Sequence, residues 1–365
     1  MTTNLPKITV ITATFNLIKD KREKFFRQCV ESVHNQTYPN IEHIVIDAAS
    51  KDGTLDLIKE YEDKGWLKCY SEPDKGMWEG MNKGIKKATG KYVCFLNSDD
   101  FYTNDDVLEL SVKKLEETQS DYCYAPFDVI KRENDEFVIH CNFLPVERFF
   151  MGMTYNHETL VCKKSVYEEL GYHNEKYRTT IDYAFNISLV LNDYKHTHIN
   201  KTMITARLGG ATTGNDGKCS KETLENIDKL YADVFDFYKF GEGSCRIMFL
   251  ENIYPPYFLQ TLKHIIFGKE LKNFNYLFFL DYVNEAQKMN DKKWSNLIDS
   301  SNCANFSYKR KIKINLFGFI RFNVVKTQYK NTYYIFRIPI MTAKIKEKFI
   351  LYKLFNFIPL LKIKG

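Results

Sequence analysis

Four short β-rich runs, separated by segments with helical spacing, fill most of the first 130 residues of this 365-residue chain. The runs are ITVITAT, IEHIVID, KCYS and YVCFL, at Ile8–Thr14, Ile41–Asp47, Lys68–Ser71 and Tyr92–Leu96. Between the first two, Lys24–Gln36 places Phe26, Cys29 and Val33 on one helical face. Strands that alternate with helices form parallel sheets covered on both faces. We therefore expect an α/β fold with a mainly parallel sheet flanked by helices.

Polar side chains follow three of these runs at the point where each run ends. Thr14, Asp47 and the segment Asn97–Asp100 stand at those ends. In such sheets, ligands bind beyond the carboxyl ends of the strands. We therefore expect the three groups to meet at one edge of the sheet and to form a ligand site there.

The segment FLNSDD, Phe95–Asp100, puts two adjacent carboxylates directly after an apolar strand. Mg²⁺ or Mn²⁺ is typically held by one or two carboxylates together with phosphate oxygens. Asp99 and Asp100 are therefore candidate metal ligands. The alternative is that Ser98 and the two acids cap the next helix, since Ser and Asp favour helix N-caps.

A second polar cluster lies in SEPDKGMWEGMNKGIKKATG, Ser71–Gly90. A turn precedes a helix expected over Met77–Ala88, and Lys and Asn near a helix start can approach an anionic donor beside free backbone N–H groups. The helix face in question carries Glu79, Asn82, Lys83 and Lys86. The alternative is an ordinary solvated face opposite a buried apolar one.

Asp47, in VIDAASKDGT, has two possible uses. A carboxylate after a buried strand accepts either from a base N–H or ribose hydroxyl of a ligand, or from backbone N–H groups of its own turn. The residues themselves leave both interpretations open.

In this order and spacing, the motifs resemble the family-2 glycosyltransferases with a GT-A fold. The matching pieces are ITATFN (Ile11–Asn16), QTYPNIEHIVIDAASKDGT (Gln36–Thr54), EPDKGMWEGMNKGIKKATG (Glu72–Gly90) and FLNSDD. The resemblance covers residues 7–215 and implies an inverting transfer of a sugar from UDP or another nucleoside diphosphate. It also implies a place in the synthesis of bacterial cell-surface polysaccharide, such as lipopolysaccharide or capsule.

The resemblance further implies which residues bind the donor. Thr14, Asp47 and Asp74 would border the base and the ribose. From their place near the start of the helix that follows, and not from the resemblance, we also expect Asn82 and Lys83 to bind the donor.

Asp99 and Asp100 stand at the DXD position of the family, so the resemblance implies that they contact the ribose and a Mn²⁺ or Mg²⁺ ion. The chain departs from the family pattern at four positions. Asn97 replaces the leading Asp of DXD, Ala48 the second acid after Asp47, Glu79 the usual Asp of the helix, and Ala13 the Pro before Thr14.

Residues 152–215 contain the acid that such a reaction needs. An inverting transfer requires a carboxylate that takes the proton of the acceptor hydroxyl. By resemblance Asp182, in TTIDYAF, is this catalytic base, His157, in YNHET, faces the donor or acceptor, and Gly209-Gly210 closes a loop over the site. The residues themselves also fit simpler roles: a helix N-cap for Asp182, a structural histidine, and an ordinary turn.

Composition divides the chain into three expected parts. A catalytic domain spans 1–218, with a donor half at about 1–130 and an acceptor half at about 131–218. A helical region follows at 219–306. The C-terminal module, 307–365, contains three segments that share an aromatic-apolar head and a basic end, so we expect short β-hairpin units there. The three are Leu316–Lys326, Ile335–Lys346 and Leu354–Lys364.

The C-terminal module also carries the positive charge. Lys309–Gly365 has 14 Lys and Arg residues and one acid, Glu347, a balance of +13, whereas the rest of the chain balances −7. Basic residues interleaved with aromatic ones favour contact with an anionic membrane surface. The alternative is a small β-structured domain that its lysines solvate. No nucleic-acid partner is expected, because no RNA- or DNA-binding motif accompanies the charge.

Other sequence features bear on the location of the protein. No segment has the roughly 18–20 consecutive apolar residues of a membrane span, and the start lacks the pattern of a signal peptide. Nine scattered cysteines fit reduced thiols and argue against a disulfide framework or zinc knuckle. We therefore expect a cytoplasmic protein that contacts the inner face of the cell membrane peripherally.

Together these features predict an enzyme, a glycosyltransferase of hexosyltransferase type that moves a sugar from a nucleotide-sugar donor, expected to be a UDP-sugar, to a glycan or lipid-linked glycan. A nucleotidyltransferase also places carboxylates at sheet ends, but it usually has a Gly-rich basic loop after the first strand, and Thr14–Leu17 contains no Gly or Arg. A non-catalytic carbohydrate- or membrane-binding module is the other alternative, and intact Asp99, Asp100 and Asp182 weigh against it. The sequence names neither the sugar, the acceptor and the linkage nor the oligomeric state.

Overall fold

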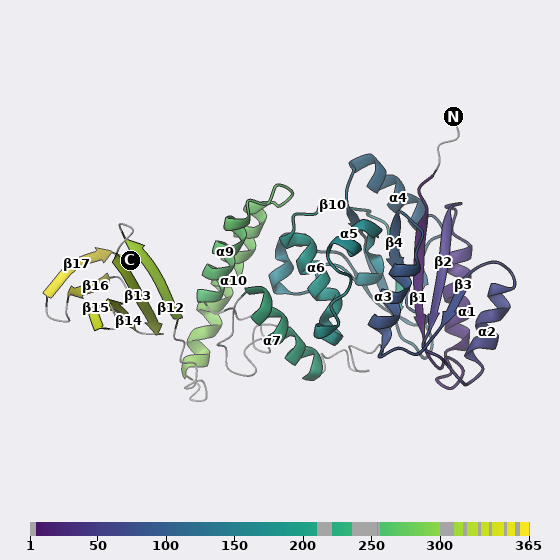
Figure 1. Cartoon of the computed structure of the whole chain (residues 1–365), viewed down its shortest axis with the longest axis horizontal. Coiled ribbons are helices and arrows are strands. Elements are labelled where there is room, and N and C mark those ends of the chain that lie inside the picture. The colour runs from purple at the N-terminus through teal and green to yellow at the C-terminus, as the bar shows by residue number, and fades with distance from the viewer. Residues whose placement is uncertain are drawn as a thin grey trace. The chain divides into compact units, whose positions relative to one another are not determined.

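A seven-stranded sheet organises the first part of the chain (Figure 1). The computed structural model describes residues 5–209, 221–235, 254 and 256–299, and six strand segments between 310 and 364. The strands of the sheet, in chain order, are β1 (Ile8–Thr14), β2 (Ile41–Asp47), β3 (Lys68–Ser71), β4 (Tyr92–Phe95), β6 (Tyr122–Tyr124), β9 (Val161–Lys163) and β10 (His196–His198). Their spatial order is β10-β6-β9-β4-β1-β2-β3. All neighbours are parallel except β9, which runs antiparallel to β4 and β6. The predicted mainly parallel sheet is confirmed.

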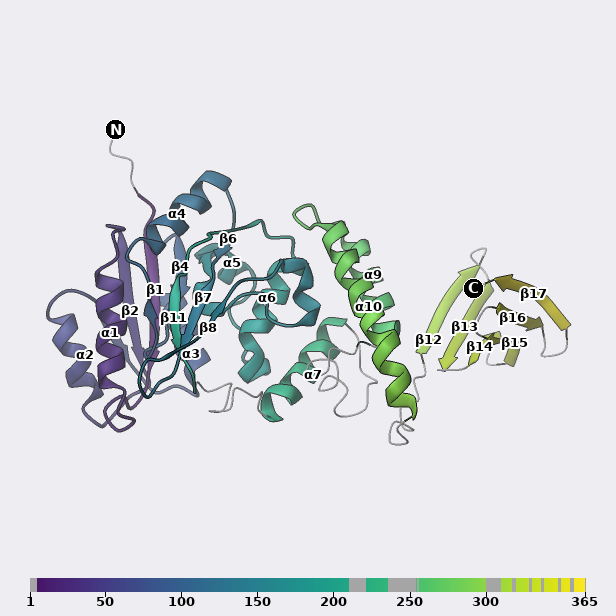
Figure 2. The same ribbon diagram turned by 180° about the vertical axis from the view of Figure 1, so that it is seen from behind.

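Helices cover both faces of this sheet (Figures 1 and 2). One face carries α1 (Glu23–His34), α2 (Thr54–Glu62) and α4 (Val107–Thr118), and the other carries α3 (Met77–Lys87), α5 (Lys164–Glu169) and α6 (Ile181–Leu191). Gly84 of α3 lies so close to β1 that a Cβ there would meet the Ile11 Cγ2 atom at 2.4 Å. On the same face, the ring of Phe95 in β4 packs edge-on against Tyr167 of α5, which stacks on Phe185 of α6. The two helices predicted with bounds, Lys24–Gln36 and Met77–Ala88, are confirmed as α1 and α3 to within two residues at their ends.

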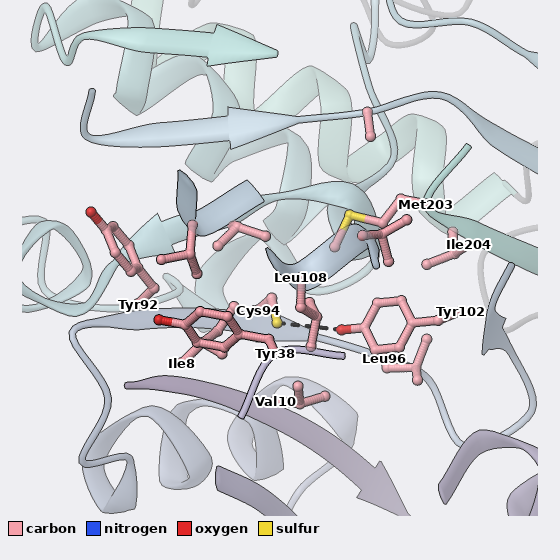
Figure 3. Close-up of a cluster of buried hydrophobic side chains, with 14 of the residues drawn as sticks. Ile8, Val10, Tyr38, Tyr92, Cys94, Leu96, Tyr102, Leu108, Met203 and Ile204 are labelled. Atoms are coloured by element: carbon pink, nitrogen blue, oxygen red, sulfur yellow. Dashed lines mark hydrogen bonds between the residues drawn. The ribbon is translucent and has the colours of Figure 1, made fainter. Parts of the chain in front are cut away.

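A closely packed core lies between the sheet and the α1/α4 layer (Figure 3). Val10 of β1, Cys94 of β4 and Leu108 of α4 are completely buried in it. The Cys94 thiol lies 3.4 Å from the Tyr102 hydroxyl. Because the side chains of this core are closely packed, they hold the end of β4 and the residues that follow it in a fixed position.

A smaller four-stranded sheet has the order β5-β11-β7-β8. Its strands are β5 (Phe101–Tyr102), β7 (Phe127–Ile130), β8 (Phe137–Cys141) and β11 (Ile204–Arg207), and the short helices η1 (Val146–Met151), η2 (His157–Thr159) and η3 (Glu175–Thr180) follow β8 in the chain. β7 and β8 form an antiparallel hairpin, while β11 pairs in parallel with β7. The sequence analysis does not predict this sheet, because its strands are two to five residues long and come from distant parts of the chain.

The region expected to be helical forms α7 (Lys221–Phe235), α9 (Pro256–Lys269) and α10 (Tyr276–Asp299). The Tyr231 hydroxyl of α7 donates to the carbonyl of Phe150 at 2.8 Å, and the ring of Phe279 in α10 packs edge-on against the Phe150 ring. Tyr231 of α7 and Phe279 of α10 therefore pack against the part of the chain that contains η1. The chain divides into one compact unit of residues 1–231 and 245–290 and a second of 232–244 and 291–365. The domain boundaries near 218 and 306 remain predictions.

The backbone of the C-terminal module forms a six-stranded antiparallel sheet in which each strand pairs with the next along the chain. The strands are β12 (Arg310–Leu316), β13 (Ile320–Thr327), β14 (Lys330–Ile335), β15 (Ile338–Lys346), β16 (Phe349–Leu354) and β17 (Ile358–Lys364). Each sequence repeat begins at the last residue of one strand, Leu316, Ile335 or Leu354, and covers most or all of the next strand. Each repeat thus supplies the second strand of one of the pairs β12–β13, β14–β15 and β16–β17, which fits the expected β-hairpin units.

Within the described residues, no helix combines the length and the apolar character that crossing a bilayer requires.

Candidate active site

A cavity of about 1180 Å³ opens at the carboxyl ends of β1, β2 and β4. Its two sides come from different parts of the chain, which we call the first wall and the second wall. The first wall is formed by residues between 13 and 100, among them Thr14, Ala48, Asp74, Trp78 and Asn97–Asp100. The second wall is formed by residues between 127 and 209, among them Arg132, His157, Glu158, Asp182, Arg207 and Gly209.

Asp100, after β4, is held in place by hydrogen bonds from both walls. Its Oδ1 accepts from the backbone N–H of Arg207 at 2.7 Å, and its Oδ2 accepts from the side-chain amide of Asn97 at 3.3 Å. Only 4% of Asp100 is exposed. Burial, and secondarily the charge of Asp99, raises the pKa of this carboxyl. Asn97, which replaces the leading acid of the family motif, thus orients Asp100 without adding a further charge.

Glu158 of η2 is a second buried carboxyl beside Asp100. It is 2% exposed, and its Oε1 accepts from the backbone N–H of Asn97 at 2.7 Å. Burial, followed by the charge of Asp100, raises the pKa of Glu158 well above its ordinary range. Two interacting buried carboxylates repel each other when both are ionised, so the site favours a shared proton or a nearby cation.

These acids have the ligand chemistry for a hard divalent cation. Among the described residues, no cluster of three or more His, Cys, Asp or Glu side chains could hold a metal by itself. Asp99 and Asp100 both line the cavity, however, and two carboxylates are the usual protein share of a Mg²⁺ site whose other ligands are phosphate oxygens and water. A cation there would also reduce the repulsion between Asp100 and Glu158. The residues present therefore fit the predicted ion.

Asp99 points toward a guanidinium group instead of a second carboxylate. It forms an ion pair with Arg132, which follows β7, while its backbone carbonyl accepts from the guanidinium of Arg207. A third arginine, Arg22, donates to the carbonyl of Phe15 at 2.6 Å. Cationic groups therefore surround the acidic motif from both walls.

Asp74 and Thr14 lie where the sequence predicts, in the first wall. Asp74, in the turn before α3, accepts from the backbone N–H of Gly76 at 2.9 Å, and burial raises the pKa of its carboxyl. Thr14, at the end of β1, is 6% exposed, and its hydroxyl donates to Asp47 at 3.4 Å. Both side chains line the cavity.

Asp47 is fully buried and bonds to its own surroundings. Its Oδ1 accepts from the Ser50 hydroxyl at 2.5 Å, and its Oδ2 accepts from the Ser71 hydroxyl at 2.7 Å and the Ser50 backbone N–H at 2.9 Å. It is absent from the cavity lining, where the next residue, Ala48, takes part. Asp47 therefore fixes the turn after β2, the second of the two uses left open by the sequence.

Asn82 and Lys83 of α3 also lie behind the cavity lining. The Asn82 side chain exchanges hydrogen bonds with the backbone of His173, at 2.9 and 3.0 Å, and the His173 ring packs on Trp78. The Lys83 ammonium donates to the carbonyl of Pro73 at 2.6 Å, next to Asp74. Both residues support segments that line the cavity.

Asp182 lies in the first turn of α6, whose N-cap is Thr180, so it is not the cap itself. Its Oδ1 accepts from the backbone N–H of Tyr183 at 2.8 Å, and its Oδ2 lies 3.8 Å from Nδ1 of His157. Burial raises the pKa of Asp182, and burial lowers that of His157, which favours a neutral imidazole. The His157 ring packs on Trp78 of the first wall at 5.5 Å. The predicted acid and histidine therefore meet in one cavity with the acidic motif.

Gly209 lines the second wall in a left-handed conformation, with φ of 94°, which glycine adopts at little cost. Gly210, the other half of the predicted pair, lies outside the described residues.

Comparison with known proteins identifies the domain that carries this cavity. Residues 9–186 match the family model described as glycosyl transferase family 2. Residues 9–186 therefore form a glycosyl transferase family 2 domain. The predicted family and the predicted class of enzyme, a glycosyltransferase, are confirmed.

Relatives match this glycosyltransferase to different extents. The glycosyltransferase GlyA of Streptococcus pneumoniae is 31% identical over 135 residues, which cover 37% of this chain and 18% of that protein. The putative teichuronic acid biosynthesis glycosyltransferase TuaG of Bacillus subtilis is 26% identical over 240 residues, which cover 63% of this chain and 92% of that protein. The chain thus spans less than a fifth of the pneumococcal relative and most of the Bacillus one.

A solved structure shares the fold. The crystal structure of Staphylococcus aureus TarS 1-349 in complex with UDP-GlcNAc aligns with a TM-score of 0.51 and 17% identity, covering 90% of this chain and 99% of that one. At this identity, the likeness supports the GT-A fold and nothing finer.

The sequence analysis of this glycosyltransferase misses three residues of the acidic site: Glu158, Arg132 and Arg207. Glu158 adjoins the predicted His157, and an acid inside an otherwise uncharged NHETL stretch is a signal that could have marked it. The two arginines belong to the second sheet or the turn beside it. Without that sheet, no sequence pattern brings them to Asp99.

Proposed function

We propose that this glycosyltransferase moves a sugar from a UDP-sugar to a glycan or lipid-linked glycan, with inversion at the anomeric carbon, in the synthesis of a bacterial cell-surface polysaccharide. The observation that carries the proposal is a single cavity lined by Asp99 and Asp100 from one wall and by Asp182 from the other. The name of TuaG, which refers to teichuronic acid biosynthesis, supports the process, and the UDP-GlcNAc bound to TarS supports the donor class.

The first wall binds the donor in this proposal. Thr14 and Asp74 contact the base and ribose directly, because their side chains line the cavity. Asp47, Asn82 and Lys83 support these residues indirectly. Asp47 acts through the turn at Ser50, Asn82 through the backbone of His173, and Lys83 through the carbonyl of Pro73.

Asp99 and Asp100 hold Mn²⁺ or Mg²⁺ in this proposal. When bound, the ion supplies positive charge that stabilises the diphosphate as it leaves. The chain keeps Asp100 aligned for that purpose through the Arg207 N–H and the Asn97 amide.

Asp182 is the catalytic base of the proposed reaction. It takes the proton of the acceptor hydroxyl while the acceptor oxygen bonds to the anomeric carbon and the bond from that carbon to the diphosphate oxygen breaks. Burial suits this role, because a raised pKa makes a carboxylate a stronger base as long as it remains ionised at the working pH. The neutral His157 beside it lines the acceptor side without attracting the proton away. Gly209 and Gly210 belong to the loop proposed to close over the site.

The C-terminal module is proposed to contact an anionic membrane surface and so to bring a lipid-linked acceptor near the cavity. Its balance of +13 supports this role, since each basic residue near such a surface contributes about 1 kcal/mol. A cytoplasmic enzyme, peripheral at the inner face of the cell membrane, is part of the same proposal.

A donor panel tests the proposed function. Release of nucleoside diphosphate is measured with UDP-, GDP- and dTDP-sugars in the presence of Mn²⁺ or Mg²⁺, with Asp100→Ala as the matched inactive control. The proposal expects turnover with at least one UDP-sugar and none with the control. If no nucleotide sugar is bound or turned over by the intact chain, the proposed function is wrong.

A further inference from the structure

Arg132 occupies a particular place in the second wall. It follows β7 in the hairpin of the second sheet, and its guanidinium forms an ion pair with Asp99 across the cavity. The Nε of Arg132 donates to the carbonyl of Leu208 at 3.3 Å. Its side chain is 27% exposed and that of Asp99 15%, and both residues line the cavity. The pair therefore faces the space where a ligand would lie.

The other two arginines that line the cavity form hydrogen bonds that hold neighbouring parts of the protein. The side chain of Arg207 is 1% exposed, and it donates to Gln28, to Asp135 and to the carbonyl of Asp99 while lying over the Phe25 ring. Arg22 donates to the Ser98 hydroxyl at 3.2 Å and to the Phe15 carbonyl at 2.6 Å. These two stabilise the loops around the acidic motif, whereas Arg132 has the most exposed side chain of the three.

Because many acids line the cavity, an anionic ligand can bind there only beside a positively charged group. The acids that line it are Asp20, Asp74, Asp99, Asp100, Glu158 and Asp182. A diphosphate entering among them is repelled unless positive charge meets it. A guanidinium presents a planar fork of donors that matches phosphate as well as carboxylate, so Arg132 can exchange its partner Asp99 for a phosphate oxygen pair with little loss.

We propose that Arg132 binds the diphosphate of the donor, and that Asp99 holds its guanidinium at the cavity wall until the donor arrives. The inference rests on the proposed function, because it takes the ligand to be a nucleoside diphosphate. Exchange of partners also frees the Asp99 carboxylate for the cation that accompanies the diphosphate. Arg132 is thereby a donor-binding residue contributed by the second wall.

The chain offers a matched control for this proposal. Lys131 is the preceding residue in the same hairpin, and its ammonium pairs with Glu136 at 2.7 Å with 47% of the side chain exposed. It is absent from the cavity lining. Lys131→Gln removes the same charge from the same turn as Arg132→Gln, so the two variants separate general charge effects from contact with the ligand.

The test measures binding of UDP and of uridine to the full chain, in EDTA and in Mg²⁺, for the wild type and four variants. These are Arg132→Gln, Arg132→Lys, Lys131→Gln and the double variant Arg132→Gln/Asp99→Asn. Loss of a charge-assisted contact weakens UDP binding by roughly 10- to 100-fold in Arg132→Gln, with uridine binding unchanged. Arg132→Lys is intermediate, because it keeps the charge and loses the fork, and Lys131→Gln binds as the wild type does.

The double variant distinguishes ligand binding from mere neutralisation of Asp99. If Arg132 only neutralises Asp99, removing both charges restores UDP affinity in EDTA, and the inference is overturned. Equal UDP affinity in Arg132→Gln and wild type also overturns it, as does an equal loss of uridine and UDP binding. If the wild type binds neither UDP, GDP nor dTDP, the proposed function itself fails. Thermal melts of each variant identify any that has lost its fold. If Arg132→Gln is one of these, UDP binding by Arg132→Lys is compared with that of the wild type instead.

Discussion

The two walls of the cavity differ in how the chain builds them. The first wall stands at the ends of parallel strands, where the register of β1, β2 and β4 sets the height of Thr14, Ala48 and Asn97. The second wall comes from short strands and 3₁₀ turns of the region 127–209, which meet the first wall through single contacts such as the Arg207 N–H to Asp100. The comparison teaches that neighbouring parallel strands set the height of residues in the first wall, while a short strand, a turn and the start of a helix, all from distant parts of the chain, supply Arg207, Arg132 and Asp182.

Removing the acid that the two walls share gives the largest expected effect. Asp100→Ala deletes the carboxylate that accepts from both Asn97 and Arg207. Loss of the cation it helps hold costs several kcal/mol of transition-state stabilisation, so transfer should fall by roughly 10³-fold or more, and EDTA should silence the wild type equally. Turnover is measured at saturating nucleotide sugar. Near-normal turnover of the variant in EDTA contradicts the metal assignment.

The second wall should set the lower pH limit of activity. Asp182 works as a base only when ionised, and burial raises its pKa above the ordinary value of about 4. Activity should therefore rise about tenfold per pH unit through that raised pKa and level off above it. The pH dependence of kcat/KM measures this. A profile that is flat down to pH about 4 would show that Asp182 is not the titrating base.

A smaller effect concerns the stability of the fold, which repulsion between the buried carboxyl groups of Asp100 and Glu158 lowers. The folded-state pKa of Glu158 is raised, so its contribution to stability is full below the unfolded pKa and is lost as pH rises toward the folded pKa. Glu158→Gln keeps an acceptor for the Asn97 N–H and removes the charge beside Asp100. Without divalent cations, the variant should melt roughly 2–4 °C higher than the wild type at pH 7.5 and no higher at pH 4. A lower melting temperature at pH 7.5 contradicts the account of the pair.

The smallest expected effect on the chemistry of either wall comes from the C-terminal module. A chain ending at Ser307 keeps every cavity residue and should turn over nucleotide sugar as before. It should lose affinity for anionic liposomes, and binding by the full chain should weaken as salt rises, because a charge of +13 acts largely through screened attraction. Liposome flotation and donor turnover measure the two properties. Unchanged liposome binding, or loss of the fold on truncation, opposes a separate membrane role.

Strong periodicity explains what the sequence predicts well. Ile8–Thr14 and Ile41–Asp47 are predicted with the bounds that the strands have, and the placement of Asp99 and Asp100 at the cavity follows from the buried β4. The same logic leaves two uses open for Asp47, because a strand-end carboxylate has the same local sequence whether it faces a ligand or its own turn. Only the hydroxyls of Ser50 and Ser71, brought together by the fold, decide the matter.

Contacts between distant segments explain what the sequence does not predict. Arg132 and Asp99 are 33 positions apart, and Arg207 and Asp100 are 107 apart. Each pair depends on the parallel pairing of β7 with β11, two four-residue strands that carry no distinct periodic pattern. The resemblance to a family supplied Asp182 and His157, whereas the local sequence around Asp182 fits a helix cap equally well.

The role of Asp182 as the base, separate from donor binding, is tested most directly by Asp182→Asn, in which UDP affinity and turnover are measured on the same preparation. The variant keeps the acceptor for the Tyr183 N–H and loses only the capacity to take a proton. The account predicts that kcat at saturating donor falls at least about 10²-fold while UDP affinity is unchanged. A variant that loses UDP binding but retains turnover at saturating donor would contradict it and would assign Asp182 to the donor.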